Sequence, residues 1–169
     1  ELASLNTARK AGIRALTLSE GDELIAVMKT DGKQDILLAS ANGMVICFNE
    51  NDVRVMGRDA AGVRGIRLKD GDWVVGAEIA QPDASVLSIT EKGYGKRTPA
   101  AEHIRGGEEP QHRGGSGMKN YNITDKTGPV AAVKVVQDSD DVLVVSDDGV
   151  IIRTGVEEIR ECGRGSQGV

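Results

Sequence analysis

Aromatic residues are nearly absent from this sequence: they make up 2% of its 169 residues, against 39% for all hydrophobic residues. The core must therefore consist of Val, Ile, Leu and Ala, of which Val and Ile favour β-strands. Proline occurs 4 times and glycine 22 times, and apolar runs recur throughout, which excludes a disordered or proline-rich chain. We predict one all-β domain over residues 1–169.

Long apolar segments and paired cysteines are also missing. No run reaches the roughly 18 to 20 apolar residues of a membrane span, and the amino end has no apolar signal region, so we expect a cytoplasmic protein without a membrane partner. Cys47 and Cys162 lie far apart, which predicts two reduced thiols rather than a disulfide or a zinc site. The sequence begins at Glu1 without Met, and we interpret it as a piece of a longer protein.

The formal net charge of −5 argues against a nucleic-acid partner, because phosphate binding requires Lys and Arg. The charges are unevenly distributed, however. Residues 92–119 carry six Lys or Arg against three Asp or Glu, and the segments on either side are acidic. Any contact with a polyanion is therefore expected to involve this central segment.

A hairpin pattern occurs three times. Each copy is an apolar run, a polar pair that ends in glycine, and a second β-rich run; the copies cover residues 35–48, 84–98 and 140–154. Glycine at the second position of a tight turn supplies the positive φ that such turns require. The turn glycines, Gly43, Gly93 and Gly149, are 50 and 56 residues apart.

A second motif, glycine followed by an apolar residue and a base, recurs at the same interval. It begins at Gly12, Gly62 and Gly117, and its last copy, Gly168-Val169, reaches the end of the sequence. One more strand-like run precedes each hairpin, at residues 23–29, 73–79 and 130–136. Four short strands per unit with a period near 50 are typical of propeller-like blades. We predict blade units of roughly 12–58, 62–110 and 117–163, with 164–169 beginning another.

Two other β folds fit less well. A β-sandwich of about twelve strands would not require the two motifs to recur together at one interval. A WD-repeat propeller would end its units with Trp-Asp, whereas Trp73 is the only Trp.

Four stretches, in order and at matching spacing, resemble the carboxy-terminal domain of the DNA gyrase A subunit, part of a bacterial type IIA topoisomerase. The stretches "MGRDAAGVRGIRL" (56–68) and "CGRGSQGV" (162–169) are similar to its glycine-arginine blade junctions. "TEKGYGKRTPAAEH" (90–103) resembles a hairpin with its exit loop, and "QHRGGSGMKNYNIT" (111–124) resembles the gyrase A box. In the box, His112 and Ser116 stand where the family has bases, and the intact box belongs to the first blade.

The resemblance implies a partial β-pinwheel, about three of six blades, each of four antiparallel strands that exchange an outer strand with a neighbour. It implies a non-catalytic module that binds and wraps DNA and supports ATP-dependent negative supercoiling by the intact enzyme. The partners would be double-stranded DNA, the remainder of the gyrase A subunit, and the gyrase B subunit. ATP, Mg²⁺ and the strand-cleaving tyrosine would belong to other parts, so we expect no cofactor and no active site here.

The glycine-rich loop 111–119 does not fit a nucleotide site. A Walker A loop would continue with Gly-Lys-Ser/Thr, whereas Met118 follows Gly117. Uncovered backbone amides beside Arg113 and Lys119 could instead hold a DNA phosphate without reading a base. Alternatively, the loop is a blade connection that needs glycine for its backbone angles.

We predict DNA contacts from this loop and from bases on the same rim. The alternatives are ordinary solvated surface charge, the equivalent domain of topoisomerase IV, and a protein-interaction scaffold that binds no nucleic acid, which the net charge favours. The predicted residues are Gln111, His112, Arg113, Gly114, Gly115, Ser116, Gly117 and Lys119 of the loop, and Lys92, Lys96, Arg97, Arg105, Arg64 and Arg67 elsewhere.

No residue pattern indicates catalysis or metal binding. His103 and His112 are predicted to be surface loop residues, and the Asp clusters near 140 and 147 lack the ligand register of a calcium loop. An incomplete pinwheel leaves strand edges open at both ends, and open edges pair with other chains. We therefore expect self-association through blade edges.

Overall fold

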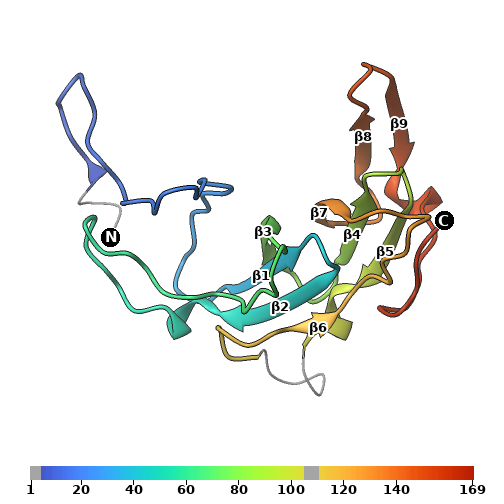
Figure 1. Cartoon of the computed structure of the whole chain (residues 1–169), viewed down its shortest axis with the longest axis horizontal. Helices are drawn as coiled ribbons and strands as arrows, with labels where there is room; N and C mark the ends of the chain where they lie inside the picture. Colours follow the sequence, from blue (N-terminus) through green and yellow to red (C-terminus); the bar gives the residue numbers. More distant parts are fainter. Residues whose placement is uncertain (1–4, 105–110) are drawn as a thin grey trace.

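A computed structural model describes residues 5–104 and 111–169, whose strands form antiparallel sheets of four, three and two strands (Figure 1). The three predicted hairpins are confirmed. A single turn of 3-10 helix follows each one: η2 (Glu50–Asp52), η3 (Ala100–His103) and η4 (Val156–Glu158). The hairpin strands are β1 (Asp35–Ser40) with β2 (Met44–Asn49), β4 (Ser85–Thr90) with β5 (Gly95–Pro99), and β8 (Asp141–Val145) with β9 (Ile151–Gly155).

Each of the first two hairpins receives a strand from the following repeat. Strand β3 (Val74–Ala80) pairs with β1, and β7 (Val130–Val136) pairs with β4. Both pairings are antiparallel and both contain a register shift at the last residue of the hairpin strand. The strand exchange that the resemblance implies is therefore present.

The glycine-apolar motif covers the other edge of each of these hairpins. Strand β6 (Met118–Lys119) pairs with β2 and completes the sheet β3-β1-β2-β6. One repeat later, Val169 exchanges two backbone hydrogen bonds of 2.9 and 3.0 Å with Gly95 in β5. Because glycine precedes the paired residue in both copies, the strand backbones can approach closely.

The sequence predicts a strand at residues 23–29, and this prediction is wrong, since the segment has no regular secondary structure. Both β3 and β7 add to the hairpin of the preceding repeat, and the part of the chain described ahead of residue 23 holds no hairpin. Within the residues that the structure describes, the expectation of four strands per blade is met in the first sheet alone. The third hairpin remains a two-stranded ribbon.

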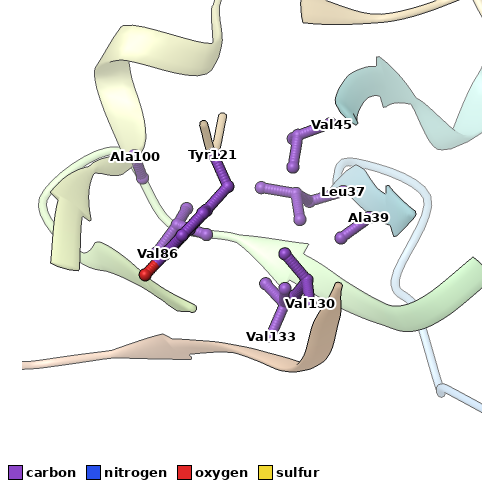
Figure 2. Packing of buried hydrophobic residues seen from close by; sticks show 8 residues of the cluster. All are labelled: Leu37, Ala39, Val45, Val86, Ala100, Tyr121, Val130 and Val133. Atoms are coloured by element: carbon purple, nitrogen blue, oxygen red, sulfur yellow. The ribbon is translucent and has the colours of Figure 1, made fainter. Parts of the chain in front are cut away.

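The largest core cluster lies between the first and second sheets. Figure 2 shows Leu37, Ala39 and Val45 facing side chains of the second sheet and Tyr121. The Tyr121 hydroxyl donates to the carbonyl of Gln167 at 2.5 Å, which ties the last junction to this core. The residues contributed by the second sheet and its following turn are Val86, Ala100, Val130 and Val133. No helix in the described ranges is long and apolar enough to span a membrane.

The close approach at Gly117 can be tested against Gly62, its equivalent one repeat earlier. Both glycines have positive φ, at 73° and 84°. A Cβ at Gly117 would overlap the Val45 carbonyl oxygen, whereas nothing lies within 4 Å at Gly62. We expect Gly62→Ala to lower the free energy of unfolding by about 1–2 kcal/mol, the cost of a left-handed backbone at a residue with a Cβ. Gly117→Ala should lower it by about 1–3 kcal/mol more, because the added methyl group overpacks the site. Urea unfolding measures both; equal losses would contradict the close approach.

Candidate nucleic-acid interface

The glycine-rich loop packs against the junction of the preceding repeat. The Gly114 N–H donates to the carbonyl of Gly65, and the Arg67 N–H donates to the carbonyl of Gly115 at 2.8 Å. Two glycine-rich segments about fifty residues apart in sequence therefore lie side by side. The pairing gathers predicted site residues of both segments: Arg64 and Arg67 of the junction and His112 and Arg113 of the loop. We call these four residues the junction cluster.

Arg113 and His112 are both held by Asp52, at the end of η2. The Arg113 Nε donates to the Asp52 carbonyl at 2.9 Å, and its Nη1 donates to the Arg64 carbonyl at 3.2 Å. The His112 Nδ1 lies 3.2 Å from the Asp52 carboxylate, although 96% of the imidazole side chain is exposed. Sequence reasoning missed Asp52, because nothing links an acidic residue to a loop sixty positions later.

The other loop residues divide between connecting and exposed roles. The Gln111 N–H donates to the Cys47 carbonyl at 2.7 Å, and Gly117 lies against β2, so part of the loop is a blade connection. Ser116 and Lys119 are exposed, and the Lys119 ammonium donates to the Asn122 side chain at 2.7 Å. The loop therefore joins the repeats and also presents polar groups to solvent.

A second group of bases lies at the turn between β4 and β5. Lys92 is exposed, and its ammonium donates to the carbonyl of Asp125. Lys126, which sequence reasoning did not select, places its ammonium 5.2 Å from the centre of the Tyr94 ring. The sequence contains a pattern that could have identified Lys126: Lys69 and Lys126 each precede a turn glycine by two residues in successive repeats.

Lys96 does not face solvent, in contrast to the expectation for the rim. Its side chain is buried, and the ammonium donates to the carbonyls of Gly163 and Arg164, both at 2.8 Å. It also lies 5.3 Å from the centre of the Tyr121 ring. Burial lowers the pKa of Lys96 to about 8. Lys96 therefore fastens the last junction to β5 and leaves no free charge at the surface.

Arg97 is similarly engaged. Its Nε donates to the Ile159 carbonyl at 2.7 Å, its guanidinium is paired with Asp138, and the side chain is mostly buried. Arg105 lies outside the described residues. The exposed bases among those predicted are thus Arg64, Arg67, Lys92 and Lys119.

The two histidines have different environments. His112 is exposed as predicted, but His103 is buried, so that prediction is wrong. Its Nε2 donates to Asn120 Oδ1 at 2.8 Å, because the Asn120 amide donates to Ser88. Burial lowers the pKa of His103. Within residues 5–104 and 111–169, no group of three His, Cys, Asp or Glu could hold a metal, and both cysteines are free thiols.

The repeated hairpin with its added strands defines an all-β domain of the propeller-like class. Residues 2–31, 34–81, 84–106, 108–137 and 140–169 match the family described as DNA gyrase C-terminal domain, beta-propeller. The chain belongs to this family, as the sequence resemblance indicated.

Curated relatives agree with the family match. The DNA gyrase A subunit of Staphylococcus epidermidis is 42% identical to this chain, and that of Staphylococcus aureus is 40% identical, each over 99% of the chain. The chain spans 18% and 19% of the lengths of these relatives.

Solved structures share the fold. A crystal structure of the C-terminal domain of DNA topoisomerase IV has a TM-score of 0.91 at 27% identity, covering 100% of this chain and 52% of the other. A structure of the DNA gyrase A C-terminal domain has a TM-score of 0.81 at 29% identity, covering 95% of this chain and 53% of the other.

The buried amine of Lys96 makes stability depend on pH. Between pH 8 and 10.5 the unfolded chain keeps this ammonium charged while the folded protein holds a neutral amine. The unfolded state then binds more protons, so the free energy of unfolding contributed by Lys96 rises with pH across this window. We expect Lys96→Met to lack that rise in urea unfolding measured against pH. Parallel profiles for the variant and the parent protein would contradict the lowered pKa of Lys96.

Proposed function

We propose that the chain binds double-stranded DNA through backbone phosphates, as a non-catalytic module of a gyrase A subunit. The observation that carries this proposal is the pairing of the loop at Gly114 and Gly115 with Gly65 and Arg67. It gathers bases from two repeats on one surface, within a chain that is acidic overall. The curated relatives at 40–42% identity support gyrase over topoisomerase IV.

Arg64 and Arg67 would make the phosphate contacts, because both are exposed. Arg113 would act differently: two carbonyls hold its guanidinium, so it fixes the loop beside Arg64 and adds positive potential. Phosphate contacts position a duplex without reading its sequence, and we therefore expect weak sequence preference.

The repeat extends the contact along the duplex. Lys92 in the β4–β5 turn, and Lys126 in the loop ahead of β7 with its ammonium 5.2 Å from the Tyr94 ring of that turn, would meet phosphates beyond the junction cluster. A duplex that follows successive repeats must curve, at an elastic cost of about 1–6 kcal/mol for a site of 20–30 bp. Counterion release on charge neutralisation would offset that cost.

In the intact enzyme, such wrapping would support negative supercoiling. That enzyme would also contain the remainder of the gyrase A subunit and the gyrase B subunit, and ATP and Mg²⁺ would act in those other parts.

The proposal predicts salt-dependent binding to a labelled duplex of about 30 bp, the length over which bending costs are appreciable. We expect Arg64→Glu/Arg67→Glu to weaken binding and to make the slope of log K against log salt shallower by about 2, because each lost phosphate contact removes about 0.9. Fluorescence anisotropy at several salt concentrations measures both quantities.

The control is Lys10→Glu/Lys33→Glu, which changes the net charge equally at exposed lysines outside the junction cluster. Equal weakening by the two double variants would mean that only net charge matters. Absence of binding by the parent chain at low salt would reject the proposed function.

A further inference from the structure

The pairing of the glycine-rich loop with the preceding junction occurs a second time, one repeat later. In the first copy, the Arg67 N–H donates to the Gly115 carbonyl at 2.8 Å. In the second copy, the Asn122 N–H donates to the Ser166 carbonyl at 3.0 Å. The glycine-rich segment 162–168 therefore packs on the junction before it in the same way as the first loop does.

Arginine occupies the same place in three equivalent segments, as the third residue of the stretches that begin at Met56, Gln111 and Cys162. The Arg58 Nη1 donates to the Arg14 carbonyl, and the Arg113 Nη1 donates to the Arg64 carbonyl, both at 3.2 Å. Each accepting residue is the base of a glycine-apolar motif, and its side chain is exposed. The segment arginine thus holds the backbone of a base whose own side chain faces solvent.

A carboxylate from the 3-10 turn after a hairpin accepts the backbone N–H of the segment arginine in two repeats. Asp52 Oδ2 accepts from Arg113 at 3.4 Å. Glu102, at the equivalent place in η3, accepts from Arg164 at 3.3 Å, and the same oxygen lies 3.9 Å from the Arg164 Nε. The contacts join residues 61 and 62 positions apart in sequence. Acid and arginine therefore form a repeated contact between the turn and the glycine-rich segment.

The glycine-rich loop uses its first backbone amides within the protein. The Arg113 N–H donates to Asp52, and the Gly114 N–H donates to the preceding junction. These amides are engaged, so side chains must make the contact with a DNA phosphate. The loop also holds the backbones of both junction bases, because the Arg64 carbonyl accepts from Arg113 and the Arg67 N–H donates to the loop. The position of the loop consequently sets the position of both bases.

We propose that Asp52 and Glu102 are positioning residues for binding of the DNA backbone. Each carboxylate fixes a glycine-rich segment and, through it, the exposed base that contacts a phosphate; this inference rests on the proposed function. Asp52 acts on Arg64 through Arg113. Glu102 acts on Lys119, the equivalent of Arg64, through the second loop pairing. A carboxylate beside a phosphate-binding surface repels the ligand, so the sign of its effect distinguishes positioning from charge.

The test replaces Asp52 in two ways that change the charge equally. Asp52→Ala and Asp52→Asn both remove a negative charge, so charge alone predicts tighter binding of the labelled duplex by both. Asparagine keeps an oxygen that can accept the Arg113 N–H, whereas alanine has none. We expect Asp52→Ala to weaken binding about tenfold at about 0.1 M salt and to make the salt slope shallower by about 1, the share of one lost phosphate contact. Asp52→Asn should bind at least as tightly as the parent chain.

Asp83→Ala is the matched control, because Asp83 is an exposed acid in the turn between β3 and β4. It removes the same charge away from both loops and should neither weaken binding nor change the salt slope. Glu102→Ala against Glu102→Gln repeats the comparison at the second loop, where 42% of the Glu102 side chain is exposed. Urea unfolding of each variant establishes that it is folded under the binding conditions.

The outcomes separate this inference from the proposed function on which it rests. If the parent chain binds DNA and both alanine variants bind equally well or more tightly, the carboxylates do not position the bases and the proposal is overturned, while the proposed function stands. Equal weakening by alanine and by the amide at both positions would also overturn it, because the retained oxygen would then have no effect. Absence of binding by the parent chain would reject both.

Discussion

The structure depends on the addition of a strand from one repeat to the hairpin of the repeat before it. An isolated two-stranded hairpin is at best marginally stable in water. With β3 on β1 and β7 on β4, Leu37 and Val133 come together in one core. The glycine-apolar motif then covers the second edge of these hairpins, so that successive repeats are interlocked rather than merely stacked.

The candidate interface is a consequence of this interlock. The loop that leads into β6 must pass the preceding junction, and its backbone pairs with that junction at Gly65 and Arg67. Bases consequently divide into two kinds. Arg64 and Arg67 remain exposed for a polyanion, whereas Lys96 and Arg97 are used within the domain to hold the last repeat against β5.

The sequence predicts most of the local structure, because spacing and turn chemistry act over short distances. The hairpins follow from their turn glycines, and the pattern predicts the run 130–136 with the bounds that β7 has. Residues 23–29 have an equally good pattern, but the described residues ahead of them hold no hairpin for this segment to join. The burial of Lys96 and His103 was not predictable, because it depends on Gly163, Arg164 and Asn120, which belong to later segments. The role of Asp52 likewise exists only after the repeats pack.

Amide hydrogen exchange of the chain, at a concentration where sedimentation gives one copy, tests the interlock most directly. If strand addition from the next repeat orders each hairpin edge, residues 74–80 and 130–136 should exchange slowly, and residues 24–30 should exchange at the rate of unstructured chain. Equal protection of all three segments in the monomer would show that the strands form independently of their neighbours, contradicting the interlock.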